Sequence, residues 1–295
     1  MRTPAASSVR LGVLGDLVQD TVVWPAEPVR PGSDTTSTVH HRRGGSAANV
    51  AAFAARLCPT RFIGCVGEDH IGTAMVAELR SHGVDVRVQR SSDAETGSIV
   101  LLIDQSGERS MFPDRGAATR LRNVDPSWLD ELAHLHVPAY AFASDPAAST
   151  AVELLSRMRA DGLGTSIDAS STGMLSAYGV SAFRELLAEL RPDVLFANRD
   201  EADMLNAWSG ITGPAAVVVK DGERPSTVLR PDGPAIRVPV PPVARVRDRT
   251  GAGDAFAAGF LAASLGGADL DAACAAGHGR AALVLASPGA TAVEP

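Results

Sequence analysis

The sequence predicts an α/β protein: a three-layer α/β/α sandwich with a mainly parallel central sheet and a small β-sheet lid. From about residue 132 to residue 219, short apolar runs alternate with helical patterns. This alternation requires crossover connections between parallel strands. Earlier in the chain, two groups of short strands at about 17–43 and 84–113 contain no helix. We interpret these groups as two parts of one small sheet that projects from the main layer and closes over a cleft.

The first third of the chain supplies elements of both sheets. The apolar run 9–15 predicts the first strand. A helix is expected at 46–57, where apolar residues recur at helical spacing and Ser46 can cap the first turn. A strand at 61–67 and a helix at about 71–82 follow. The strands after this helix that we assign to the lid are 84–88, 97–104 and 109–112.

The rest of the chain alternates strands and helices and ends in two alanine-rich helices. The predicted strands lie at 132–137, 164–167, 194–197 and 215–219. The predicted helices between them lie at 150–159, 181–190 and 200–208. The final elements are a hairpin-like pair of strands at 226–230 and 235–240 and helices at 254–265 and 271–285. Together these elements predict one domain that spans residues 1–295.

Composition limits the classes of function. The 295 residues are 45% hydrophobic, which suffices for one large core with a small appendage. The net charge is -7 and the longest basic stretch is 40–43, which argues against a nucleic-acid partner. No apolar stretch is long enough to span a membrane, and the three cysteines lack metal-type spacing. We therefore expect a cytoplasmic protein with reduced thiols.

The strongest chemical signal is Asp-Arg-Thr-Gly-Ala-Gly-Asp-Ala-Phe at 248–256, directly before an apolar helical run. Glycines allow a tight turn, and backbone N–H groups at a helix N-terminus bind phosphate. A carboxylate at this place, Asp254, suits a base that takes the proton of a hydroxyl while the amides hold a phosphoryl group. The alternative is an ordinary helix start whose acidic residue complements the helix dipole.

Two further motifs accompany this segment. Gly44-Gly45 and Asn49 lead into the alanine-rich residues 51–57 of the expected helix, and Asn-Arg-Asp-Glu at 198–201 stands at the end of a core strand. With all three motifs, the chain resembles the ribokinase-like (PfkB) family of sugar and nucleoside kinases from about Val9 to Ala290. The resemblance implies a ribokinase-like fold and ATP-dependent phosphorylation of a hydroxyl of a monosaccharide or sugar acid.

The resemblance also implies roles for residues around the reacting groups. Asp254 is expected to be the general base. The amides expected to form the anion hole are those of Gly251, Ala252 and Gly253. The residues expected to bind the acceptor are Asp20, at the end of the first strand, with Gly44, Gly45 and Asn49.

Other implied roles concern the nucleotide and its cations, ATP and Mg²⁺ with K⁺ as a further candidate. Glu201 is expected to hold Mg²⁺ through water, and Asp248 is a candidate K⁺ ligand. The residues implied at the nucleotide are Asn198, Lys220, Gly222, Thr250 and His278. A turn glycine, a surface lysine and a helix-face histidine are the structural alternatives for Gly222, Lys220 and His278.

Several departures and alternatives concern the acceptor. Val18 stands where ribokinases tend to have a polar residue, which weakens a ribose-specific assignment. The chain is only 4% aromatic, and Trp24 and Phe112 are the main rings on the expected lid. The scarcity of rings favours a free or acid-bearing monosaccharide over a nucleoside as the acceptor. Arg109 or Arg115 is available if the acceptor carries a negative group. The open alternatives are an adenosine- or pseudouridine-type nucleoside kinase, a non-catalytic sugar sensor on a kinase scaffold, and an oxidoreductase. The lid could also join two copies in a homodimer.

Overall fold

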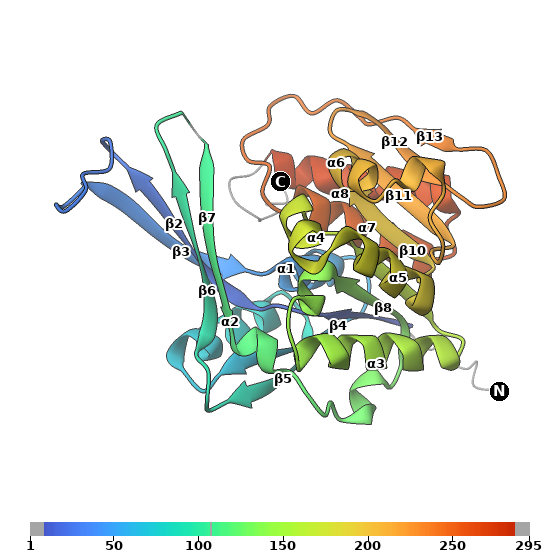
Figure 1. The fold of residues 1–295 in the computed structure, drawn as a ribbon, viewed down its shortest axis with the longest axis horizontal. Coiled ribbons are helices and arrows are strands. Elements are labelled where there is room, and N and C mark those ends of the chain that lie inside the picture. The colour runs from blue at the N-terminus through green and yellow to red at the C-terminus, as the bar shows by residue number, and fades with distance from the viewer. Residues whose placement is uncertain (1–8, 107, 287–295) are drawn as a thin grey trace, which may run out of the picture.

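The computed structural model describes residues 9–106 and 108–286. Its main body is a nine-stranded sheet in the order β13-β12-β11-β10-β9-β8-β1-β4-β5, parallel from β5 to β11 and antiparallel from there to β13 (Figure 1). The strands are β1 (Arg10–Leu14), β4 (Thr60–Gly67), β5 (Asp85–Ser91), β8 (Leu132–Pro138), β9 (Gly164–Asp168), β10 (Val194–Asn198), β11 (Ala216–Asp221), β12 (Arg224–Leu229) and β13 (Ile236–Val238).

Two hydrophobic cores, one on each face of this sheet, make the three layers. One core contains residues of α1 (Ser46–Ala54), α2 (His70–Ser81), α7 (Ala252–Leu265) and α8 (Leu270–Leu285). The other contains residues of α3 (Ala147–Ala160), α4 (Thr172–Tyr178), α5 (Val180–Leu190), α6 (Arg199–Met204) and the short 3₁₀ turns 117–120, 126–129, 139–142 and 207–209. Strand side chains alternate between the two cores, so a parallel sheet covered on both faces is buried throughout. The predicted three-layer fold is confirmed.

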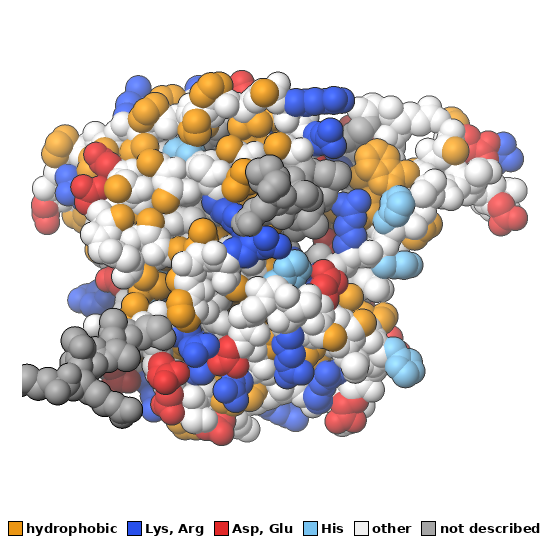
Figure 2. All heavy atoms as spheres, turned by 180° about the vertical axis from the view of Figure 1, so that it is seen from behind, with side chains coloured by type: hydrophobic (Ala, Val, Ile, Leu, Met, Phe, Trp, Pro, Cys, Tyr) orange, Lys and Arg blue, Asp and Glu red, His pale blue; other side chains and the backbone are white. Residues whose placement is uncertain are grey.

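A second sheet of four strands extends from the body. Its order is β3-β2-β6-β7, with a small core of its own formed by Val18, Val22, Ile99, Leu101 and Ile103. Figure 2 shows this sheet from behind as an arm that carries histidine side chains on its surface. Its strands are β2 (Val18–Pro25), β3 (Ser37–Gly44), β6 (Thr96–Ile103) and β7 (Arg109–Gly116).

The second part of this sheet begins later than the sequence suggested. Residues 84–88 were expected in the lid, but β5 pairs in parallel with β4 at the edge of the large sheet. The reason is the intervening helix α2, which provides the crossover that a parallel β–α–β unit needs. The two parts of the small sheet are therefore 18–44 and 96–116.

Candidate active site

Polar side chains gather where three neighbouring parallel strands end. Asp168 is the last residue of β9, Asn198 is the last of β10, and Lys220 lies one residue before the end of β11. The ladder pairs Asn198 with Lys220 across β10 and β11. The carboxyl ends of parallel strands meet at one edge of the sheet, which is where open α/β sheets bind ligands.

The N-terminus of α7 carries the predicted base and anion hole. Gly251 occupies the N-cap with φ 76°, a left-handed conformation that glycine adopts without strain. Ala252 N–H donates to the carbonyl oxygen of Arg249 at 3.3 Å, so this amide also closes the preceding turn. Asp254 lies in the first turn of the helix. The helix start therefore brings amide donors and a carboxylate to one place.

Both carboxylate oxygens of Asp254 accept hydrogen bonds from α1. Ser46 Oγ donates to Oδ1 at 2.7 Å, and Asn49 Nδ2 donates to Oδ2 at 2.9 Å. Arg43 Nη1 in turn donates to Asn49 Oδ1 at 2.8 Å, which fixes the orientation of the amide. Ser46 was expected to cap α1, but Gly45 holds the N-cap position and the serine hydroxyl serves Asp254 instead.

The surroundings of Asp254 set its protonation. Burial raises the pKa of Asp254 to about 6, against hydrogen bonds from Ser46 and Asn49 that lower it. The nearby carboxylate of Asp168 adds to the rise, and the ammonium of Lys220 opposes it. A carboxyl group with this pKa is mostly ionised at neutral pH and still a usable proton acceptor, as a general base requires.

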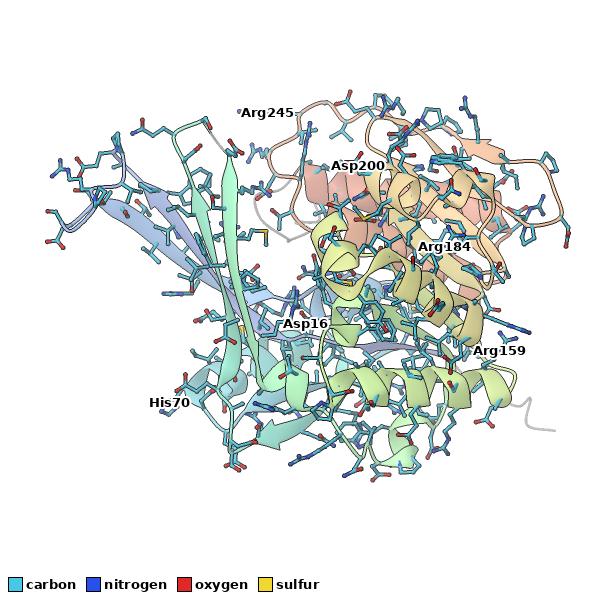
Figure 3. The ribbon with its side chains drawn as sticks, viewed as in Figure 1. Asp16, His70, Arg159, Arg184, Asp200 and Arg245 are labelled. Atoms are coloured by element: carbon cyan, nitrogen blue, oxygen red, sulfur yellow. The ribbon has the colours of Figure 1, made fainter. Side chains whose placement is uncertain are left out.

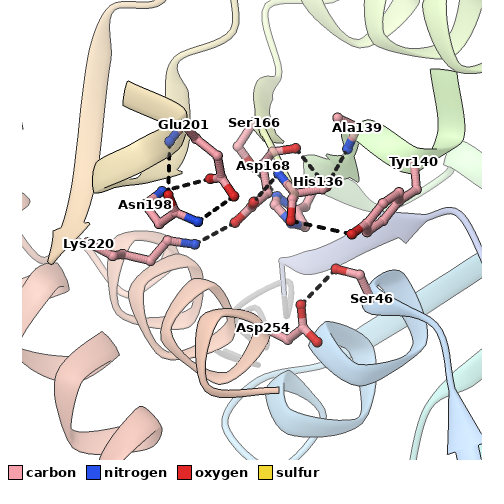
Figure 4. Close-up of polar contacts among 11 residues, drawn as sticks. Ser46, His136, Ala139, Tyr140, Ser166, Asp168, Asn198, Glu201, Lys220 and Asp254 are labelled. Atoms are coloured by element: carbon pink, nitrogen blue, oxygen red, sulfur yellow. Dashed lines mark hydrogen bonds and ion pairs between the residues drawn. The ribbon is translucent and has the colours of Figure 1, made fainter. Parts of the chain in front are cut away.

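Asn198 and Glu201 form a capping box at the start of α6 (Figure 4). Asn198 Oδ1 accepts from the Glu201 N–H at 2.9 Å, and Glu201 Oε2 accepts from the Asn198 N–H at 2.7 Å. Asn198 Nδ2 also donates to Glu201 Oε1 at 2.6 Å. Burial raises the pKa of Glu201 to about 7, with a further contribution from the charge of Asp168.

These groups suit Mg²⁺ held through water. Each carboxylate oxygen of Glu201 has a second lone pair beyond the hydrogen bond that it accepts from Asn198. Mg²⁺ usually keeps several waters and takes one or two carboxylates together with substrate phosphates. Within 9–106 and 108–286, no group of three or more His, Cys, Asp or Glu side chains forms a metal cage. The carboxylate of Glu201, with its second lone pairs, fits a hydrated Mg²⁺ that also takes oxygens of the nucleotide.

Asp20 and Gly44, two of the residues expected to bind the acceptor, lie side by side in the small sheet. Asp20 was expected at the end of the first strand, but it lies inside β2, opposite Arg42 of β3. Its carboxylate packs against Gly44, where a Cβ atom would overlap it, so a side chain at position 44 would displace the carboxylate. Burial raises the pKa of Asp20 to about 6, and the charges of Arg43 and Arg42 oppose the rise.

Asp16 is a buried carboxylate that the sequence analysis did not select. It follows β1, is 4% exposed, and forms an ion pair with Arg115 of β7. Figure 3 labels it at the junction of the small sheet and the body. The Arg115 guanidinium lies 4.1 Å from the centroid of the Tyr140 ring. The position of Asp16 after a buried parallel strand is the signal that could have identified it.

The small sheet also reaches the loop before α7. Arg109 donates to Asp248 Oδ1 at 2.7 Å and to Thr250 Oγ1 at 2.6 Å. Burial raises the pKa of Asp248, but hydrogen bonds from Thr250 and Arg109 outweigh this and lower it to about 2. The oxygens expected to hold K⁺ therefore accept hydrogen bonds from the Arg109 guanidinium. A K⁺ ion would have to compete with this guanidinium for them.

Two residues implied at the nucleotide lie apart from this group. His278 of α8 is 7% exposed, its Nε2 lies 2.9 Å from Ser226 Oγ, and its ring packs edge-on against Phe256. These contacts fasten α8 to β12 and the helix beside it. Gly222, with φ 61°, forms the turn between β11 and β12.

The two aromatic residues of the small sheet lie on opposite faces. Asp20 pairs with Ile99, and Trp24 shares the face of Asp20 because residues an even number apart in a strand point the same way. Phe112 pairs with Val100, the neighbour of Ile99, and so points to the other face. Of these two rings, only that of Trp24 is on the face that carries Asp20.

The site thus unites residues that the sequence placed in separate motifs. The structure joins Asp254 to Asn49, and Lys220 to Asp168. Asp168 is a site residue not expected from the sequence, although a carboxylate at the end of a parallel strand is a recognisable signal. Arg43 was missed because it precedes the glycine pair and resembles a solvated turn residue.

No helix within 9–106 and 108–286 has the length and apolar character needed to cross a bilayer.

The sequence matches the profile described as pfkB family carbohydrate kinase over residues 11–295. An ATP-dependent ribose-1-phosphate kinase of Halopiger xanaduensis is 32% identical over 272 residues, 88% of this chain and 87% of the relative. A fructokinase of Klebsiella pneumoniae is 30% identical over 86% of this chain and 83% of the relative. The crystal structure of adenosine kinase from Sinorhizobium meliloti superposes with a TM-score of 0.85 at 24% identity, covering 97% of this chain and 96% of that one.

Proposed function

Because the chain belongs to the pfkB family of carbohydrate kinases, it is an ATP-dependent kinase, and we propose that its acceptor is a monosaccharide or a sugar acid. The observation that carries this proposal is the Asp254 carboxylate, held by α1 at the N-terminus of α7. Asn49 donates a hydrogen bond to Asp254, the proposed general base. Asp20 lies in β2, in the same small sheet whose strand β3 leads into α1. One cluster thus combines a base with polar groups suited to sugar hydroxyls.

The proposed reaction follows from these positions. The acceptor hydroxyl gives its proton to Asp254, and its oxygen forms a bond to the γ-phosphorus of ATP. The bond between that phosphorus and the β–γ bridging oxygen breaks, and the electron pair stays on ADP. The amides of Gly251 to Gly253 supply donors at the N-terminus of α7. When Mg²⁺ is bound, it adds positive charge at the outer phosphates, and Asn198 with Glu201 would hold it through water.

Support for a sugar comes from the character of the acceptor side. Asp20 and Asn49 are polar groups that pair with vicinal hydroxyls, and a site built this way rejects analogues that lack one. The relatives named as ribose-1-phosphate kinase and fructokinase support the same class. Arg115, already paired with Asp16, would meet an acidic group on the acceptor.

A nucleoside is the second candidate. Trp24 is 46% exposed and lies on the face of the small sheet that carries Asp20. An indole ring in this place could stack on a nucleobase, which is the specific observation that favours this candidate.

A panel of acceptors tests both proposals. ADP release would be measured with MgATP and ribose, fructose, 2-keto-3-deoxygluconate, ribose 1-phosphate, adenosine or pseudouridine. We expect the highest kcat/KM for a sugar or sugar acid. A nucleoside that wins by an order of magnitude would overturn the sugar assignment.

We further propose that residues 1–295 act as one kinase domain whose small sheet is the lid, and that the lid joins a homodimer in the cytoplasm. Phe112 is 58% exposed on the face of the small sheet that points away from Asp20, which supports an apolar contact between copies. The free thiols of Cys58, Cys65 and Cys274 support a reducing compartment in this proposal. Sedimentation equilibrium of the protein and of Phe112→Ser would test the dimer, which should dissociate in the variant.

A further inference from the structure

Lys220 is the only lysine in the chain. The other 26 of its 27 basic residues are arginines, so the surface cations are supplied by arginine. The lysine side chain is only 17% exposed, and it lies at the carboxyl edge of the sheet within the candidate active site. A surface role does not explain a lysine in this place.

The ammonium of Lys220 lies beside the start of α7. Its Nζ donates to Asp168 Oδ2 at 2.8 Å. A Cβ atom placed on Gly253 would lie 3.4 Å from this Nζ, so the ammonium is next to the anion-hole turn. In Figure 4 the side chain extends from β11 toward Asp168, with Asp254 below it. A phosphoryl group held by the first turn of α7 would therefore be within reach of Lys220.

The charges around Lys220 keep it protonated. Burial lowers the pKa of Lys220, but the carboxylates of Asp168, Glu201 and Asp254 outweigh this and raise it. The ammonium thus lies in the field of three carboxylates. Among the residues that the structure describes, it donates a hydrogen bond to Asp168 and lies 6.0 Å from the centroid of the Phe196 ring. A compact ammonium on a flexible stem can change partner more easily than a planar guanidinium, which suits a residue that works in two positions.

We propose that Lys220 is a catalytic residue: its ammonium moves from Asp168 to the non-bridging oxygens of the γ-phosphoryl group during transfer. This inference rests on the proposed phosphoryl transfer and adds a contact to it. Lys220 neither gives nor takes a proton. Asp254 receives the proton of the acceptor, the new P–O bond forms, and the electron pair of the broken bond stays on ADP. The ammonium neutralises charge on the transferred group at the place where the amide donors act.

The first test uses nucleotide binding and needs no acceptor. Calorimetry would compare the non-hydrolysable ATP analogue AMP-PNP with ADP, each with Mg²⁺, for the protein and for Lys220→Met. Loss of a charge-assisted hydrogen bond to the γ-phosphate should raise the Kd of AMP-PNP by about tenfold. The Kd of ADP should change by less than about twofold. Equal weakening of both nucleotides would overturn the proposal.

The second test separates catalysis from simple charge balance. Lys220→Met should lower kcat by about 10²–10³-fold, the range for loss of one transition-state donor. If Lys220 only neutralised Asp168, the double variant Lys220→Met/Asp168→Asn would regain activity. We expect the double variant to stay as slow as Lys220→Met, and recovery to within a few-fold of the parent would overturn the catalytic role.

Two controls keep these outcomes distinct. Arg224→Met removes a 71% exposed cation from the neighbouring strand of the same hairpin and should change neither measurement. Thermal unfolding would verify that each variant is folded before it is assayed. If no acceptor in the panel is phosphorylated but AMP-PNP binding is selectively lost, the acceptor proposal fails and the contact of Lys220 with the γ-phosphate stands.

Discussion

Asn49 donates a hydrogen bond to the carboxylate of Asp254 at 2.9 Å, across 205 positions of the chain. The contact joins the first turns of α1 and α7, the two helices that begin at the glycine-containing motifs. Because Arg43 holds the oxygen of the same amide, its NH₂ group must face the base. In the proposed function, Asn49 therefore belongs both to the acceptor site and to the surroundings of the general base.

Asp254→Asn should retain nucleotide and acceptor binding but lose turnover. The amide cannot accept the proton, and general-base catalysis contributes roughly 10²–10⁴-fold, so the loss should fall on kcat more than on KM. Steady-state kinetics with both substrates would measure it. Asp271→Asn, an exposed acid in the first turn of α8, is the matched control. Turnover of Asp254→Asn within a few-fold of the parent would remove this residue from the role of base.

Activity should rise with pH through about 6, because Asp254 must be ionised to act and its pKa is raised to about that value. Ser46→Ala removes a hydrogen bond that lowers this pKa, so the acid limb of the kcat profile should move to higher pH. Profiles from pH 5 to pH 9 would show the shift. Ser264→Ala, on the exposed side of α7, should leave the profile unchanged, and a Ser46→Ala limb at unchanged or lower pH would contradict the assignment.

Removal of divalent ions with a chelator should abolish activity, and Mg²⁺ should restore it. Glu201→Gln leaves one hydrogen-bond acceptor for the capping box but removes the charge, so the Mg²⁺ concentration for half-maximal activity should rise by about tenfold. Titration of MgCl₂ at fixed ATP would measure this. Glu185→Gln, exposed on α5, is the control. Full activity in the chelator would exclude the metal role.

Asp20→Asn should weaken binding of the acceptor and leave binding of the nucleotide unchanged. Loss of a hydrogen bond to a charged group lowers acceptor kcat/KM by roughly 10- to 150-fold, while KM for ATP stays constant. Kinetics with the best acceptor would separate the two substrates, with Asp34→Asn, exposed on the small sheet's connecting loop, as the control. A matching rise in KM for ATP would show that Asp20 acts on the whole site.

Arg109→Ala should make the loop before α7 more responsive to K⁺. The guanidinium binds Asp248 and Thr250, so its removal leaves these oxygens to a monovalent cation. We expect half-maximal activation at a lower K⁺ concentration than in the parent. The pair is partly exposed and should change the free energy of unfolding by no more than about 1 kcal/mol. An unchanged K⁺ requirement, equal to that of Arg30→Ala, would disprove the competition.

The layers and the three motifs could be predicted because their signals are local. Helical spacing, strand alternation and the glycine turn before Asp254 all lie within short windows of sequence. The assignment of β5 failed because a short apolar strand looks the same whether it joins a large or a small sheet. The position of Asp20 within β2 was missed for a similar reason, since the boundary of a strand depends on its pairing partners.

Contacts between distant side chains were beyond the sequence. Nothing near Lys220 indicates that it crosses β10 to reach Asp168, because that contact depends on strand order. The pairing of Arg109 with Asp248 likewise depends on the tertiary structure, which brings β7 beside the loop before α7. The raised pKa of Asp254 has the same origin, since it reflects burial by elements from both ends of the chain.

The separation of the molecule into two sheets bears on how such enzymes diversify. Val22 and Trp24 share the face of Asp20 on the small sheet, whereas Asp254, Lys220 and Glu201 belong to the body. Substitutions of these β2 residues leave the side chains of the body in place. An enzyme of this fold can therefore keep its residues for phosphoryl transfer and change its acceptor specificity through a few substitutions on β2.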